Sequence, residues 1–167
     1  MGDRKLRDVA SPLGALNEPA PVNLHGIYLL AAQYAQMGML EEAEAGFIEA
    51  MELADNDFPM PRFQLGQLLM VRGRPDEAID VLLPLADTVD PALRAYAGAF
   101  IALGKHQEAA AGAALREGLQ HPQSIPALAD DMRRLLADLE RRSAIPIEAP
   151  AVTGPAASML LSNYQKH

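Results

Sequence analysis

Three segments of the chain share one local pattern, and this repetition limits the folds open to the sequence more than any other feature. In each segment a glycine is followed by four residues and then by an alanine, with a glutamate directly before the alanine. The glycines are Gly38, Gly73 and Gly104, so successive spacings are 35 and 31 residues. A period of this length indicates a repeated supersecondary unit.

The chemistry of the pattern predicts a helix, a turn and a second helix. Glycine supplies the left-handed backbone that ends a helix, and Pro75 suits the first turn of the next one. A glutamate in that first turn complements the helix dipole. Apolar residues recur at helical spacing on both sides of each glycine, so each unit is expected to be a helical pair and the fold to be all-α.

The pattern resembles the tetratricopeptide repeat (TPR) family, a 34-residue helical pair with characteristic residues at eight positions. The repeats are expected at about 24–57, 59–92 and 90–123. The matching residues are Leu30, Ala31, Tyr34, Gly38, Ala43, Phe47 and Ala50; then Leu65, Gly66, Gly73 and Ala78; then Ala97, Phe100, Gly104 and Ala109. In the third repeat, Ala113 and Arg116 fall where the family has a large apolar and a small residue.

This resemblance implies a right-handed superhelical solenoid of about three helix pairs. The alternative is an unrelated six-helix bundle with similar turns. A C-terminal capping helix is expected over 125–142, with an apolar face and an opposite polar face. The apolar face holds Leu128, Met132, Leu135, Leu136 and Leu139, and the polar face holds Asp130, Asp131, Arg133, Arg134, Asp138 and Glu140.

Composition divides the chain into three parts. Residues 1–22 and 143–167 are rich in Pro, Ala and Gly, so they are predicted to be a flexible N-terminal segment and a Pro/Ala-rich linker with a short tail. The TPR domain is therefore expected over 23–142. The net charge of -8 arises in that middle part, and residues 24–57 alone carry seven acidic and no basic side chains. Such a chain is a poor candidate for binding nucleic acid.

The sequence offers no pattern of catalytic or metal-binding residues. It has no cysteine, no phosphate-binding loop, and no paired spacing among His25, His106, His121 and His167. Glu41, Glu42 and Glu44 are explained by their place at a helix start. We therefore expect no enzyme activity, no cofactor and no metal. No apolar run reaches the ~18 residues of a membrane span, and no secretory signal is evident, so a cytoplasmic location is the expectation.

In TPR proteins the first helix of each pair lines a concave groove that holds a peptide or helix of a partner. The resemblance carries this role to three sets of residues. These are His25, Tyr28, Ala32, Ala35 and Gln36; Met60, Phe63, Gln67, Met70 and Val71; and Arg94, Gly98, Ile101 and Ala102. The alternative is that Phe63, Met70 and Ile101 only pack against neighbouring helices. The function predicted is a bacterial-type adaptor or scaffold, with a basic partner favoured by the acidic first repeat.

The tail that follows the linker carries four large apolar or aromatic residues, Met159, Leu160, Leu161 and Tyr164. We expect this segment to dock on an apolar surface, either the groove of its own chain or that of a second copy in a homodimer. The alternative is an unstructured tail. The chain is also similar in size, repeat number and acidity to the three-repeat chaperones of type III secretion translocators, which gives a second functional prediction.

Overall fold

The computed structural model describes residues 23–54 and 57–144, and this part of the chain is all-helical. The all-α prediction is therefore confirmed. The elements are α1 (Leu24–Gln36), α2 (Leu40–Leu53), α3 (Met60–Val71), α4 (Pro75–Leu82), the 3-10 helix η2 (Leu83–Asp87), α5 (Pro91–Gly104), α6 (Glu108–Gln120) and α7 (Pro126–Ala144).

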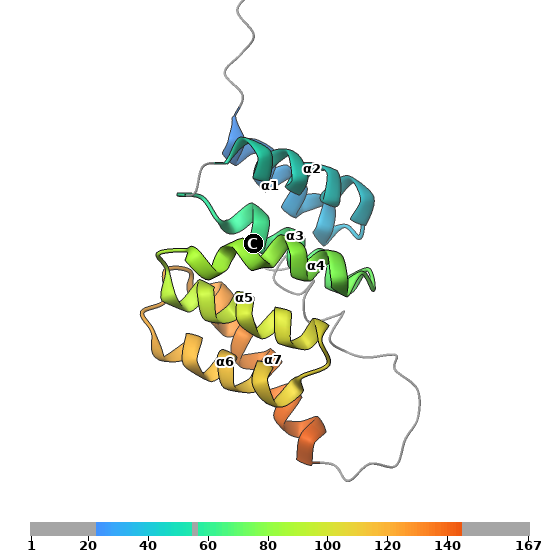
Figure 1. Ribbon diagram of the computed structural model, residues 1–167. Coiled ribbons are helices and arrows are strands. Elements are labelled where there is room, and N and C mark those ends of the chain that lie inside the picture. Colours follow the sequence, from blue (N-terminus) through green and yellow to red (C-terminus); the bar gives the residue numbers. More distant parts are fainter. Residues whose placement is uncertain (1–22, 55–56, 145–167) are drawn as a thin grey trace, which may run out of the picture.

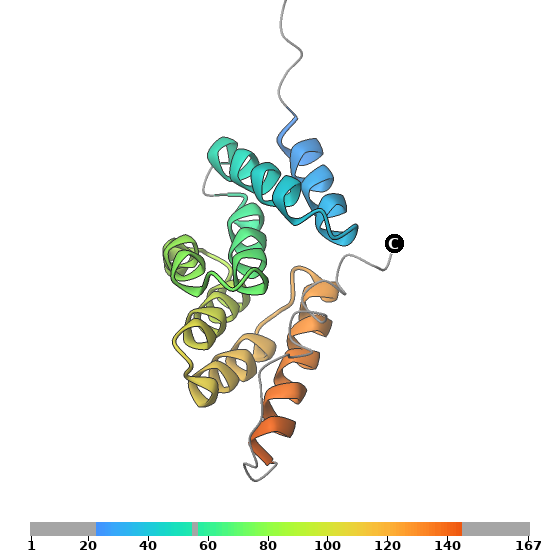
Figure 2. The same cartoon turned by 90° about the vertical axis from the view of Figure 1, so that its right-hand side faces the viewer.

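Helices that follow one another in the sequence pack against one another in space. The pairs α1–α2, α3–α4 and α5–α6 are each in contact, α2 packs on α3, α4 packs on α5, and α7 packs on α6. The pairs follow one another from α1–α2 at one end of the molecule to α7 at the other (Figure 1). The same succession is visible after a quarter turn, with α7 running beside α6 (Figure 2).

Polar side chains and prolines fix where several helices begin. The Asn23 side chain accepts a hydrogen bond from the Gly26 backbone N–H at the start of α1. Asp90 Oδ1 accepts from the N–H groups of Ala92 and Leu93 at the start of α5, and its Oδ2 accepts from the Ser124 hydroxyl. These bonds satisfy N–H groups that a helix cannot satisfy internally.

The turn of the third pair corrects the register predicted from glycine spacing. Gly38 and Gly73 have positive φ angles of 77° and 70°, as expected for residues that end a helix. In the third pair the positive φ of 57° belongs to His106, and Gly104 is the last residue of α5. The left-handed residues are therefore 35 and 33 residues apart, and the overlap of the second and third 34-residue repeats shrinks from residues 90–92 to residue 92 alone.

The buried small residues follow the same two-residue shift. Ala43, Ala78 and Ala111 each lie in the first turns of the second helix of a pair and are fully buried, whereas Ala109 is exposed. Leu115 and Gly118, both buried, occupy the positions that the sequence assigned to Ala113 and Arg116. The third pair thus keeps the pattern of the other two, but its turn lacks the glycine that would have marked it.

Two apolar clusters form the core. One joins α1, α2, α3 and α4 around Phe47, Leu65 and Leu69, and the other joins α3, α5, α6 and α7 around Phe63, Tyr96 and Phe100. The α7 residues Leu128, Met132, Leu135 and Leu139 are buried in the second cluster, as their spacing predicts, and Leu136 is partly buried against it.

Candidate interaction surface

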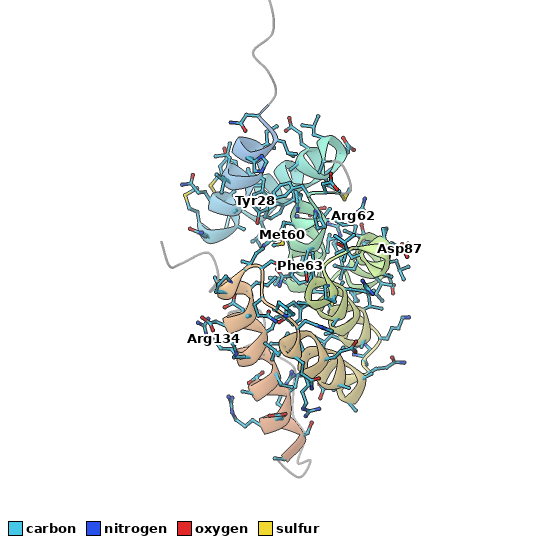
Figure 3. The ribbon with its side chains drawn as sticks, turned by 90° about the vertical axis from the view of Figure 1, so that its left-hand side faces the viewer. Tyr28, Met60, Arg62, Phe63, Asp87 and Arg134 are labelled. Atoms are coloured by element: carbon cyan, nitrogen blue, oxygen red, sulfur yellow. The ribbon has the colours of Figure 1, made fainter. Side chains whose placement is uncertain are left out.

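The α3 residues predicted to line the groove are inside the molecule. Met60, Phe63 and Gln67 are 8%, 0% and 5% exposed. The Phe63 ring packs edge-on against the Phe100 ring, with 5.6 Å between ring centroids. Figure 3 shows Met60 and Phe63 within the packed interior. These three side chains therefore do not offer a surface to a partner, which corrects the expectation for them.

The start of α7 lies close to α3 and α5. A small cavity of about 20 Å³ is lined by Met60 of α3, Leu93 and Tyr96 of α5, and Ile125 and Leu128 at the beginning of α7. All the large apolar side chains of α7 that are buried belong to the same cluster as Phe63 and Phe100. The start of α7 thus lies beside Met60, one of the residues to which the resemblance gave a binding role.

Hydrogen bonds join α5 to the connection between α6 and α7. The Tyr96 hydroxyl donates to Gln123 Oε1 at 2.6 Å, and the Gln123 amide donates to the carbonyl oxygens of Gly118 and His121. Gln123 lies in the connection between α6 and α7. The Tyr96–Gln123 hydrogen bond therefore holds α5 close to the segment that precedes α7.

The α5 residues predicted for the groove are displaced by the register shift. The residues 33 positions after Met60, Phe63 and Gln67 are Leu93, Tyr96 and Phe100, and all three are buried. The predicted Arg94 is exposed, and its guanidinium donates to the Thr88 carbonyl oxygen at 2.9 Å. Ile101 is half-buried against the second core cluster.

Most groove residues predicted in α1, and Met70 near the end of α3, are more accessible than Met60, Phe63 and Gln67. Tyr28 is half-buried between Phe47 and Phe58, with ring centroids 6.0 Å and 5.2 Å away, and burial raises the pKa of its phenol. The His25 ring stacks on Phe58 at 4.8 Å. Ala32 and Met70 are half-buried. Of the fourteen residues expected to line the groove, five are buried and nine keep accessible surface; the buried ones are Ala35, Met60, Phe63, Gln67 and Ala102.

Exposed apolar side chains gather on the first helical pair. Among the described residues nine large apolar side chains are exposed, and six of them belong to α1, α2 or the turn between them. We call these six residues the first-pair surface; they are Leu29, Leu30, Met37, Met39, Ile48 and Leu53. Exposed apolar residues gathered in one region indicate an interaction site more strongly than scattered ones.

The same pair carries the excess of negative charge. Glu42, Glu49 and Glu52 are exposed, and none has an ion-pair partner within 23–54 or 57–144. Glu44 differs, because its carboxylate accepts hydrogen bonds from Arg72 and Arg74 and so fastens α2 to the turn between α3 and α4. The first-pair surface is therefore apolar and has free carboxylates nearby.

A second cavity, of about 330 Å³, lies between the loop after α2 and the segment η2. Its walls include Met51, Phe58 and Leu85, with Arg62 and Asp87 among its polar residues. Arg62 Nη1 donates to the Val81 carbonyl oxygen at 3.3 Å, and Figure 3 shows Arg62 and Asp87 on this side of the molecule. No pattern in the sequence indicates this cavity, because its walls come from segments far apart in the chain.

Two carboxylates predicted to lie on the polar face of α7 are buried. Asp131 and Asp138 are 8% and 1% exposed. Asp131 Oδ1 accepts from Arg134 at 2.7 Å and Asp138 Oδ1 accepts from Arg141 at 2.9 Å, but the second oxygen of each has no hydrogen-bond partner. Burial raises the pKa of Asp131 to about 6, against the lowering effect of Arg134.

Within the described parts of the chain, no three His, Asp or Glu side chains lie close enough together to hold a metal ion. None of the helices described is both long and apolar enough to cross a membrane. The predicted docking residues of the tail, Met159, Leu160, Leu161 and Tyr164, lie outside the described residues. No family model matches this chain, and no significant match was found among curated proteins or among solved structures.

Proposed function

We propose that this chain is a non-enzymatic protein-interaction module of the TPR type, with helix pairs in a right-handed superhelical array and α7 as its capping helix. The left-handed residues 35 and 33 positions apart support this assignment, as do the fully buried Ala43, Ala78 and Ala111 at matching places. The module holds a segment of a partner protein and acts as an adaptor or scaffold.

The observation that carries the proposal is the first-pair surface. Six of the nine exposed large apolar side chains lie there, on a pair whose residues 24–57 carry a net charge of -7. Burial of two or three of these side chains by a partner would supply most of the binding free energy, at roughly 1.5–3 kcal/mol each. The carboxylates would speed the approach of a basic partner.

The contact proposed here differs from the full groove expected from the resemblance. Met60, Phe63 and Gln67 of α3 are buried, whereas α1 keeps His25 exposed and Tyr28 and Ala32 half-exposed. The proposed contact area therefore starts from the first-pair surface and extends to the inner side of α1. The prediction of a cytoplasmic secretion-system chaperone of the three-TPR type is the second candidate, and no contact among the described residues favours it.

Selection of a random peptide display library on the immobilised full-length protein tests the proposal. The enriched peptides should combine apolar and basic residues. Their binding should fall at least about tenfold in the double variant Leu30→Asp with Leu53→Asp, which places a charge in an apolar contact on each helix of the pair.

The control is the double variant Leu83→Asp with Val89→Asp, which changes two residues of similar or greater exposure outside the first pair. Binding should be unchanged in this variant. Equal loss in both double variants, or in neither, contradicts the proposal.

The tail supplies a separate test. If residues 156–167 occupy the proposed surface, their deletion should raise the affinity of the selected peptides or convert a dimer to a monomer. If deletion changes neither property, self-docking of Met159, Leu160, Leu161 and Tyr164 is wrong, while binding at the first pair is unaffected.

A further inference from the structure

Helix α1 is unusually apolar for a helix with an exposed side. Its thirteen residues include no Asp, Glu, Lys or Arg. Leu29 is 61% exposed and Leu30 is 47% exposed. Helices that face water normally carry charged residues on that side, so the composition of α1 is that of a helix covered on both sides.

A comparison of α1 with α3, at the 35-residue spacing of the first two pairs, shows that no helix among the described residues packs on one of the faces of α1. The α3 residues equivalent to Gly26, Leu29, Leu30 and Gln33 of α1 are Pro61, Gln64, Leu65 and Leu68, and all four of these are buried. Helix α2 packs on α3, and its Phe47 shares an apolar cluster with Leu65 and Leu68. We call Gly26, Leu29, Leu30 and Gln33 the open face of α1, because no described helix takes the place there that α2 has on α3.

The preceding part of the chain does not repeat the pattern of α2. The residues 35 positions before Ala43 and Phe47, which are fully buried in α2, are Asp8 and Pro12. A carboxylate and a residue without a backbone N–H are poor substitutes for these two apolar positions inside a helix. The sequence therefore disfavours the preceding segment, residues 1–22, as the occupant.

Charge argues against a second copy and for a basic occupant. Residues 24–57 carry a net charge of -7, so two copies joined at their first pairs would bring like charges together. The exposed carboxylates of Glu42, Glu49 and Glu52 are available to lysine or arginine side chains of a partner. Helix α2 meets the apolar cluster of α3 with large apolar residues four positions apart, Phe47 and Met51. An occupant that packs on α1 in the same way must be an amphipathic helix with the same spacing.

We propose that the open face of α1 binds a basic amphipathic helix of a partner protein, which lies on α1 as α2 lies on α3. This inference rests on the proposed function and specifies both the face used and the kind of partner. The partner helix buries Leu29 and Leu30, and its basic residues face the carboxylates of α2.

The probe for this proposal is a labelled peptide that copies residues 40–53 with Glu41, Glu42, Glu44, Glu49 and Glu52 each replaced by lysine. It retains the apolar face with which α2 meets α3 and has a basic polar face. The matched control peptide has the same residues in an order that leaves no apolar pair four positions apart. Fluorescence anisotropy measures the affinity of each peptide for the full-length protein.

The basic peptide should bind about tenfold more tightly than the scrambled one, because only the former buries a continuous apolar face. Leu30→Asp and Leu29→Asp should each weaken its binding about tenfold or more, from the loss of a buried leucine contact. Leu83→Asp and Val89→Asp, which lie outside the first pair, should leave its affinity within about twofold. Circular dichroism should show an unchanged fold in all four variants, since each of these side chains is exposed.

Several results would overturn the inference. Equal binding of the two peptides would show that charge alone is recognised. Binding lost in Leu53→Asp but kept in Leu30→Asp would move the site off α1 while leaving the proposed function standing. Binding that appears only after deletion of residues 1–22 would make the chain's own segment the occupant. A dimer that dissociates in Leu30→Asp would make it a second copy.

Discussion

Leu82 of α4 lies directly over Gly66 of α3, so closely that a Cβ atom on the glycine would stand 2.4 Å from Leu82 Cγ. Leu82 is fully buried. The absence of a side chain at position 66 is therefore what allows the two helices of the second pair to approach each other. Gly46 is related in the same way to Ala31 in the first pair, at 2.8 Å from its Cβ.

Gly66→Ala should destabilise the protein by about 1–3 kcal/mol, because the new methyl group forces Leu82 or the helix backbone to move. The control is Gly98→Ala, which also lies within a helix but meets no atom within 4 Å. This variant should gain about 0.5–1 kcal/mol from the better helix propensity of alanine. Equilibrium urea unfolding measures both, and a stable Gly66→Ala would refute the close-packing argument.

His106→Gly should stabilise the protein by about 0.5–1 kcal/mol, because His106 holds a positive φ of 57° that glycine adopts without steric cost. Gly73→Ala should do the reverse and cost about 1 kcal/mol. Since nothing lies within 4 Å of a Cβ at Gly73, that cost comes from the backbone alone. Loss of stability in His106→Gly would show that the third turn does not share the geometry of the second.

Asp131 should make the protein more stable as the pH falls from 7 towards 4. Burial raises its pKa in the folded state to about 6, from an ordinary value of 3.8. Between these values the folded state holds a proton that the unfolded state has lost, so acidification favours folding. Asp131→Asn should lower the gain between pH 7 and pH 4.5 by about 1–2 kcal/mol.

Urea unfolding at the two pH values measures this difference against wild type. Gly98→Ala is the control, because it changes stability without altering a titratable group. It should follow the wild-type pH dependence. An Asp131→Asn variant with the same pH dependence as wild type would contradict the assignment of the effect to the buried carboxyl group.

The helical pairs could be predicted from the sequence because their signals are local. Glycine at a turn, proline at a helix start and apolar residues at helical spacing act within a few residues of one another. The third turn was predicted two residues too early, because the left-handed residue is His106 and the sequence pattern pointed to Gly104. Asp90 as the cap of α5 would have helped to place the third pair correctly.

The candidate site was less predictable, because accessibility depends on what lies across the fold. The spacing of Leu128, Met132, Leu135 and Leu139 shows that α7 has an apolar face, but not that this face meets the cluster of Phe63 and Phe100. Conversely, Leu29 and Leu30 look like ordinary core residues until the place of α1 at the end of the stack is known. The lack of charge in α1 was the available signal.

In the proposed binding mode the partner lies on the first helical pair, and the buried groove residues of α3 and α5 stay covered. Hydrogen–deuterium exchange of the full-length protein, with and without a peptide from the display selection, tests this most directly. The account predicts added protection in α1 and α2, at residues 24–53, and unchanged exchange in α7. Protection of residues 60–71 and 91–104 without protection of residues 24–53 would contradict it, since the partner would then bind α3 and α5 instead of the first pair.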